Sequence, residues 1–199
     1  MRVADSSAER ARLSGWCELE ARRKILFGYP HWIPQPVTKP PKPKHGQPKP
    51  FKSVQAKRTV LLVTLSDETG TTIEGLRLRV TAWENRKMAD ITATLEVLEV
   101  EQWVCISRVD FLPPAPHGNK FWRRFQLAPE ISGSHIHFCR DNARIGALAF
   151  SKAENLPNAA PIETEPQSFR DICRMLERSW NVDGLVGVKA PDWDGGFLC

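Results

Sequence analysis

The sequence predicts an α+β fold in which a largely antiparallel sheet is flanked by an N-terminal helix and a C-terminal packing helix. Runs rich in β-branched residues follow one another at short intervals after residue 57, and a stretch with helical spacing of apolar residues lies near each end. At 199 residues, 41% of them hydrophobic, the chain can bury a substantial core. We divide it into an N-terminal helix at 1–27, a basic arm or linker at 28–56, an α+β core domain at 57–183 and an irregular tail at 184–199.

The N-terminal helix is expected from about Ser6 to Leu26. Ser6 and Glu9 have the spacing of a capping box, in which each side chain bonds the backbone N–H of the other residue. Apolar residues then recur at helical intervals, which favours an amphipathic helix.

The arm differs sharply in composition from its surroundings. Eight prolines alternate with lysines in residues 28–52, and proline at this density disfavours helix and sheet and favours polyproline II. Between Ala21 and Ser66 there are ten Lys or Arg residues and no Asp or Glu, so removing these ten cations from the net charge of +5 leaves −5 for the rest. The segment is either a simple linker or an arm that contacts nucleic acid or an acidic partner. Its candidate nucleic-acid-binding residues are Lys39, Lys42, Lys44, Lys49 and Lys52.

Seven runs after the arm are expected to be strands, and turn-forming residues at 67–70 and 85–87 predict hairpins. The runs are Arg58–Leu65, Leu76–Trp83, Ile91–Val100, Trp103–Leu112, Trp122–Leu127, Ser134–Cys139 and Ile145–Phe150. A C-terminal helix is then expected, with Thr164 as its cap and Pro166 in its first turn, covering the sheet with an apolar face.

The cellular environment is also constrained. No run approaches the roughly 18 apolar residues that span a bilayer, and the first 21 residues lack a signal-peptide core, so we expect a cytoplasmic protein with no membrane partner. The five cysteines are scattered and form no CxxC pair, which favours reduced thiols. Glycine-rich phosphate loops, GxSxG and HExxH motifs do not occur in the sequence, which disfavours ATP-dependent and common hydrolase classes.

The strongest candidate for chemistry is the run from Ser134 to Cys139. Strand alternation places His135, His137 and Cys139 on one face, and Ile136 and Phe138 on the other, toward the core. The two imidazoles are therefore expected on an exposed face, with Cβ atoms about 7 Å apart, close enough to reach one ligand.

Arg108 and Asp110 share one face of a neighbouring predicted strand, and His117 follows on a proline-stiffened loop. If the strands pair, these groups fit phosphodiester cleavage. His135 and His137 would act as base and acid with His117 assisting, Arg108 would stabilise negative charge, and Asp110 would orient an imidazole.

Two other interpretations of these residues stay open. His135, His137 and Cys139, joined by His117 or Asp110, could ligate Zn²⁺, whereas the acid–base cluster needs no cofactor. The histidines could also be exposed or hydrogen-bonded without a catalytic role, beside a simple Arg–Asp salt bridge.

A further pair of cations lies beside aromatic residues. Arg123 and Arg124 stand between Trp122 and Phe125, a pattern that could bind RNA by stacking and charge. An ordinary amphipathic strand is the simpler interpretation.

Several of these motifs together resemble an uncharacterised family of small bacterial proteins with Arg-x-Asp, Pro-Pro-x-His-x-Asn and His-x-His motifs. The matching segments are Arg108-Val109-Asp110, residues 113–119, residues 133–137 and the helix end at Trp180-Asn181-Val182, within roughly residues 75–183. An extra residue precedes His117, and the basic arm has no counterpart in that pattern. The small size of the family's members implies toxin–antitoxin or phage-defence loci, and hence a protein partner such as an antitoxin or a larger complex.

These observations lead to two functional hypotheses. The first is a toxin-like ribonuclease, an RNA endonuclease, that uses the His/Arg/Asp cluster. The second is a non-enzymatic inhibitor or adaptor from a phage or mobile element, which docks a nucleic-acid-handling machine through its basic arm. Under the second hypothesis the histidines are dispensable.

Overall fold

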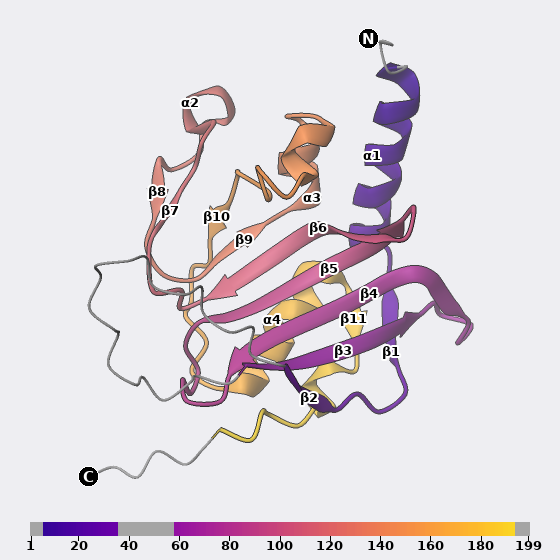
Figure 1. Ribbon diagram of the computed structural model, residues 1–199, viewed down its shortest axis with the longest axis vertical. Coiled ribbons are helices and arrows are strands. Elements are labelled where there is room, and N and C mark those ends of the chain that lie inside the picture. Colours follow the sequence, from indigo (N-terminus) through magenta and orange to yellow (C-terminus); the bar gives the residue numbers. More distant parts are fainter. Residues whose placement is uncertain (1–5, 36–57, 194–199) are drawn as a thin grey trace, which may run out of the picture.

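A nine-stranded, mostly antiparallel sheet forms the centre of the protein (Figure 1). The structure is a computed structural model, and it describes residues 6–35 and 58–193. The strand order is β10-β9-β6-β5-β4-β3-β1-β11, and β2 pairs with β3 beside this path. The first strand in this order, β10, comprises Ala160–Pro161. With helices near both ends of the chain, this arrangement confirms the α+β class.

The four longest strands form an antiparallel meander, in which each pairs with the next along the chain. They are β3 (Arg58–Ser66), β4 (Thr72–Trp83), β5 (Ile91–Glu99) and β6 (Gln102–Phe111). Alternate residues of β4, such as Leu76, Leu78 and Val80, are buried, as the period-2 pattern predicts. The four long strands and their hairpins are confirmed, and every end agrees within one residue except the start of β4, which begins at Thr72 and not at Leu76.

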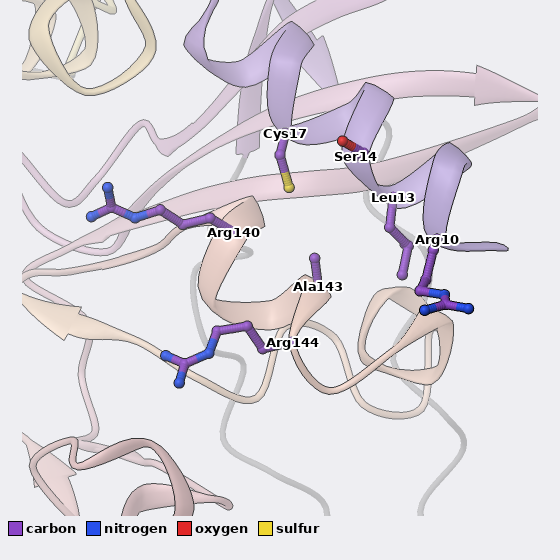
Figure 2. Close-up of a pocket in the computed structure, with 7 residues that line it drawn as sticks. All are labelled: Arg10, Leu13, Ser14, Cys17, Arg140, Ala143 and Arg144. Atoms are coloured by element: carbon purple, nitrogen blue, oxygen red, sulfur yellow. The ribbon is translucent and has the colours of Figure 1, made fainter. Parts of the chain in front are cut away.

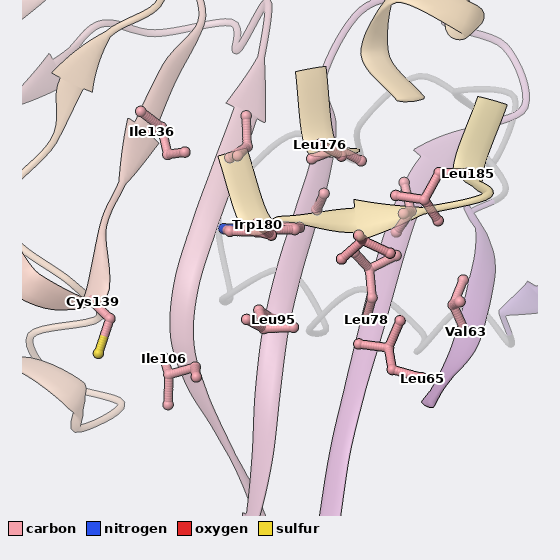
Figure 3. Close-up of a cluster of buried hydrophobic side chains, with 14 of the residues drawn as sticks. Val63, Leu65, Leu78, Leu95, Ile106, Ile136, Cys139, Leu176, Trp180 and Leu185 are labelled. Atoms are coloured by element: carbon pink, nitrogen blue, oxygen red, sulfur yellow. The ribbon is translucent and has the colours of Figure 1, made fainter. Parts of the chain in front are cut away.

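One face of this meander is covered by α4 (Phe169–Trp180), whose apolar stripe explains its position. Figure 3 shows Leu176 and Trp180 lying over the sheet near Leu78 and Leu95, and all four side chains are buried. The opposite face carries the polar members of each strand, including those of the candidate site.

The C-terminal helix begins later than expected. Ser168, and not Thr164, is its N-cap, because the Ser168 Oγ accepts a hydrogen bond from the Asp171 backbone N at 3.1 Å. After Asn181 the chain adds β11 (Val182–Asp183), which pairs in parallel with β1, and a short 3₁₀ turn at Leu185–Gly187.

The N-terminal helix is shorter than expected, and the residues after it form a strand. α1 (Ser6–Ala21) ends before β1 (Lys24–Phe27), which pairs with β3. The buried Lys24 explains the end of the helix, since its Nζ donates to the carbonyls of Leu19 (2.8 Å), Glu20 (2.9 Å) and Arg22. A side chain that binds the last carbonyls of a helix stabilises its C-terminus.

The first residues assigned to the arm belong to the sheet. β2 (Trp32–Gln35) pairs with β3 along four residues, so the boundary of the arm at residue 28 was wrong. Pro34 is tolerated there because β2 is an edge strand. The remainder of the arm, from residue 36 to residue 57, lies outside the described residues.

Two other predicted strands are wrong. Trp122–Leu127 contains the short helix α2 (Trp122–Phe125), which follows β7 (His117–Gly118) and precedes β8 (Glu130–Ile131). Ile145–Phe150 contains a 3₁₀ helix at Ala147–Phe150, because Gly146 has a φ of +112° and the Ala147 N–H donates to Glu9 at 3.0 Å. In both segments backbone N–H groups donate to carbonyls a few residues earlier, as Leu127 does to Trp122 at 3.0 Å and Ala149 to Gly146 at 3.1 Å.

Within residues 6–35 and 58–193, no helix combines the length and apolar character that a membrane span requires.

Candidate functional site

The pairing of β6 with β9 (His135–His137) assembles the candidate site at one end of the sheet. Arg108 lies opposite His137, and Asp110 lies opposite His135. Directly paired residues project from the same face of a sheet, so the four side chains gather on the face away from α4. The predicted convergence of the two strands is therefore found in the structure.

His117 completes the cluster from β7. Its ring stacks on that of His135 with centroids 5.0 Å apart, and meets the edge of His137 at 4.7 Å. The proline-rich loop before β7 thus delivers the third imidazole, as the sequence suggested.

The histidines of β9 are buried, in contrast to the exposed pair expected. The exposed fractions of His135 and His137 are 2% and 0%. The segment at 155–157 brings backbone carbonyls against the site, where they contact His117, His137 and Arg108. The simple explanation of solvated surface histidines is excluded by this burial.

His137 is a neutral imidazole whose two nitrogens are both engaged. Its Nδ1 lies 2.6 Å from the carbonyl oxygen of Leu156, which only accepts, so the proton is on Nδ1. Its Nε2 then accepts from Nη2 of Arg108 at 2.8 Å. Burial lowers the pKa of His137 to about 4, which agrees with this neutral form.

Arg108 links three parts of the site through its guanidinium. Besides contacting His137, it donates through Nε to Asp110 at 2.8 Å and through Nη1 to the Asn155 carbonyl at 3.2 Å. Its side chain is 13% exposed, so this charge is partly desolvated and firmly oriented.

Asp110 is held as a carboxylate. Burial alone would raise its pKa, but the neighbouring His135 and His137 and the charge of Arg108 outweigh burial and hold the pKa of Asp110 well below its usual range. Thr92 also donates to its Oδ1 at 2.9 Å. The other oxygen, Oδ2, lies 3.4 Å from Nε2 of His135.

His135 is oriented by the backbone just before β9. Its Nδ1 lies 3.0 Å from the Gly133 carbonyl oxygen, so Nδ1 donates there and Nε2 faces Asp110. Gly133 has a φ of +85°, and a Cβ at this position would lie 2.5 Å from Glu165 Oε1. The positive φ favours glycine at the turn that presents this carbonyl, and a larger residue would also have to displace the Glu165 side chain.

A cleft of about 300 Å³ opens over part of this cluster. Its lining residues are Arg108, Asp110, Pro113, Pro114, Ala115, Pro116, His117 and His135. Burial lowers the pKa of the half-buried His117, and the nearby His135 adds to the effect, so His117 is neutral at neutral pH. The cleft therefore offers a neutral imidazole, a second imidazole, a guanidinium and a carboxylate to a small ligand.

The histidines also satisfy part of a metal-site geometry. One ring nitrogen from each of His117, His135 and His137 lies within 4.8 Å of the others. His135 and His137 both donate a hydrogen bond from Nδ1–H to a backbone carbonyl. Metal-binding histidines commonly make such a bond with the ring nitrogen that does not contact the metal, because it fixes the orientation of the ring. The position of Arg108 disfavours a bound metal ion. Its guanidinium already contacts Nε2 of His137, and it places a positive charge where the cation would have to lie.

The thiol of Cys139 is not beside these imidazoles. The strand ends after His137, and Cys139 begins the short helix α3 (Cys139–Ala143), so alternation no longer sets its direction. Its Sγ lies 2.9 Å from that of Cys17 on α1.

The candidate nucleic-acid-binding residues divide into two groups. Arg123 and Arg124 lie on α2, stacked against Trp122 and Phe125 with guanidinium-to-centroid distances of 4.8 and 5.1 Å. Lys39, Lys42, Lys44, Lys49 and Lys52 lie outside the described residues.

Some contributors to the site were missed from the sequence. The carbonyls of Asn155, Leu156 and Pro157 contact Arg108, His137 and His117. Asn155 and Leu156 have φ of +47° and +59°, and this left-handed conformation directs their carbonyls to the site. No local sequence pattern predicts it. Thr92 was also missed, although its pairing with Asp110 follows from the meander.

The chain was compared with protein-family models, curated proteins and solved structures, and none of the three comparisons found a match.

Proposed function

We propose that the protein is a toxin-like ribonuclease that cleaves RNA by general acid–base catalysis in the cleft above β6 and β9. One observation carries the proposal: His117 and His135 stack 5.0 Å apart and line the same cleft as Arg108 and Asp110. Two imidazoles beside a fixed positive charge are what phosphodiester transesterification needs.

The reaction uses the RNA's own 2′-hydroxyl as nucleophile. The 2′-oxygen attacks the adjacent phosphorus while one imidazole takes the hydroxyl proton. The bond from phosphorus to the 5′-oxygen breaks, and the second imidazole gives that oxygen a proton. The products are a 2′,3′-cyclic phosphate and a 5′-hydroxyl.

The geometry favours one assignment of these roles. The neutral His117 suits the base, and His135 suits the acid, because the Asp110 carboxylate lies 3.4 Å from its Nε2. Arg108 supplies the positive charge that stabilises the phosphorane. The sequence suggested that His135 and His137 act together as base and acid. In the proposed mechanism His117 replaces His137 in this pair, because His137 is fully buried and positions Arg108.

The polar face of the sheet provides a surface that leads away from the cleft. Arg79, Thr94, Arg108 and His137 are successive cross-strand partners on β4, β5, β6 and β9, so they form one row on this face. Near this row Arg77 stacks on Trp103 at 3.8 Å, a pairing suited to bases. Because Arg77 and Arg79 share the Glu96 carboxylate, one excess positive charge remains for a phosphate.

A metal-dependent variant of the same activity rests on the grouping of three imidazole nitrogens within 4.8 Å. In that case His117, His135 and His137 would hold Zn²⁺, which would supply Lewis-acid chemistry, and Arg108 would have to leave His137. Metal analysis of the purified protein and of its His135→Ala variant separates the two, since the zinc variant requires stoichiometric metal that is lost with His135.

The experiment that tests the proposal measures cleavage of short RNA oligonucleotides by the full chain. His117→Ala and His135→Ala should each lower the rate by about 10²-fold or more, at unchanged circular dichroism. His31→Ala is the matched control, because His31 is exposed and outside the cluster. If the site variants cleave as well as the control, the histidines are dispensable and the adaptor hypothesis, with docking through the basic arm, replaces the ribonuclease.

A further inference from the structure

A second group of reactive side chains lies between α1 and α3 and is not part of the histidine site (Figure 2). Cys17 lines a cleft of about 340 Å³, and its Sγ lies 2.9 Å from the Sγ of Cys139. A disulfide bond measures about 2.05 Å, so only a small approach separates the two free thiols from a covalent bond.

The two thiols differ in access. Cys17 is partly exposed on the wall of the cleft, whereas Cys139 is fully buried behind it. The Cys139 backbone N–H donates to the Glu20 carboxylate at 3.0 and 3.2 Å, which fixes the start of α3 against α1. A molecule in the cleft therefore meets Cys17 first, and Cys139 can attack only from behind.

The rim of the cleft is cationic. Arg10, Arg140 and Arg144 line it, and Figure 2 shows Arg10 and Arg140 on opposite sides of Cys17, with the guanidinium groups of Arg140 and Arg144 directed outward from the thiol. Arg140 and Arg144 are exposed, and their guanidinium groups lie 4.8 Å and 4.6 Å from the ring centroids of Phe138 and Phe125. The carboxylates near Cys17 belong to Glu18, Glu20 and Asp141, and none of these residues lines the cleft. Asp141 lies 3.8 Å from Nε of Arg140 and partly offsets its charge, so Arg144 makes the larger contribution to the positive rim. The approach to the thiol therefore favours an anion.

We propose that Cys17 and Cys139 form a thiol–disulfide exchange site that reacts with small anionic disulfides bound by Arg140 and Arg144. The Cys17 thiolate attacks one sulfur of the disulfide, whose S–S bond breaks and releases one thiolate that takes up a proton. A mixed disulfide on Cys17 results. Cys139 then attacks Cys17 Sγ, and the second small thiolate leaves with the Cys139 proton, so two electrons pass from the protein to the small molecule.

The thiol chemistry agrees with this order. The hydrogen bond with Cys139 lowers the pKa of Cys17, despite opposition from burial and nearby carboxylates. The same hydrogen bond, together with burial, raises the pKa of Cys139, so Cys17 attacks first and Cys139 reacts only with the sulfur held against it. Burial raises the pKa of Cys105 and of Cys173 to about 12, and neither has a disulfide placed beside it. The site does not depend on the proposed ribonuclease activity.

The test compares two disulfides of opposite charge on the full chain, with Cys199→Ser to remove the terminal thiol. Oxidised glutathione is anionic and cystamine is dicationic, and the rate of protein disulfide formation is followed by mass spectrometry with peptide mapping. We expect a link between residues 17 and 139 that forms about tenfold faster with oxidised glutathione at equal concentration. Equal rates, or a link between other cysteines, would overturn the proposal.

Variants assign the two thiols and the cations. Cys139→Ser should accumulate a mixed glutathione disulfide on Cys17, and Cys17→Ser should react at neither position. Arg140→Ala with Arg144→Ala should reduce the glutathione rate to that of cystamine, whereas Arg170→Ala, another exposed arginine, should leave it unchanged. The arginine variants keep the test decisive if a cysteine variant does not fold, and an unaltered charge preference in the double variant would contradict the assigned binding.

Discussion

Nη2 of Arg108 lies 2.8 Å from Nε2 of His137, and the other nitrogen of that ring lies 2.6 Å from the carbonyl of Leu156. A buried, neutral histidine thereby holds a guanidinium beneath the cleft. In the proposed ribonuclease, this relationship would give His137 a positioning role, and the groups that line the cleft would carry out the proton transfers.

The first prediction concerns acid stability. The pKa of His137 is about 4 in the folded protein against 6.5 in the unfolded chain, so between these values the unfolded chain binds more protons. The free energy of unfolding should therefore fall as the pH drops from 6.5 to 4, by up to about 3 kcal/mol from this group. Urea denaturation across this range measures it. His137→Asn should show a shallower pH dependence, and an equally steep one would contradict the assigned neutral form.

The second prediction concerns the geometry of Arg108. Lysine keeps the charge but cannot contact Asp110, His137 and the Asn155 carbonyl together, as the guanidinium does. Arg108→Lys should lower the RNA cleavage rate by about 10²-fold, with a smaller effect on KM. Arg86→Lys, at an exposed arginine in the turn after β4, is the control. Full activity of Arg108→Lys would show that charge alone suffices.

The third prediction tests how β9 is attached to the core. The indole of Trp180 donates to Ser107 Oγ at 2.8 Å, and that hydroxyl donates to the His137 carbonyl at 2.9 Å. Ser107→Ala leaves a buried donor and a buried acceptor unpaired, which should lower the free energy of unfolding by about 2–4 kcal/mol. Chemical denaturation followed by tryptophan fluorescence measures this loss. A change below about 0.5 kcal/mol would mean that this chain of hydrogen bonds does not secure β9.

The fourth prediction concerns the buried Lys24, whose pKa burial lowers to about 8. Between pH 8 and 10.5 the unfolded chain binds the proton that the folded protein has lost, so the free energy of unfolding should rise with pH. The rise from this group is up to about 3 kcal/mol, and Lys24→Met should lack it. The difference between the two unfolding curves isolates Lys24 from other groups that titrate there. Parallel curves would refute the lowered pKa.

Much of the fold was predictable, because alternation and turn chemistry act locally. The meander of β3 to β6 follows from its apolar periodicity, and the same rule places Arg108 and Asp110 on one face. The strands predicted at Trp122 and Ile145 failed because a strand needs a neighbour, and neither segment has one in the described sheet. Strand composition alone cannot reveal whether a partner is present.

The sequence predicted which residues of the candidate site lie together, but it did not predict that they are buried. The register brings His135 and His137 to Asp110 and Arg108, as alternation suggested. Their burial depends on carbonyls at 155–157 about twenty residues away, where Asn155 and Leu156 adopt positive φ. Cys139 was misplaced because a helix begins there, and its contact with Cys17 joins residues too distant in the sequence for any local pattern to connect.

The most direct test of the ribonuclease is cleavage of a single-stranded RNA oligonucleotide in excess EDTA, beside the same oligonucleotide with 2′-deoxy sugars throughout. The mechanism requires the 2′-hydroxyl and no metal, so the RNA should be cleaved to 2′,3′-cyclic phosphate ends and the deoxy strand should stay intact. His135→Ala should abolish the cyclic product. An intact RNA strand, equal cleavage of both strands, or activity that disappears with EDTA would contradict the metal-free acid–base mechanism.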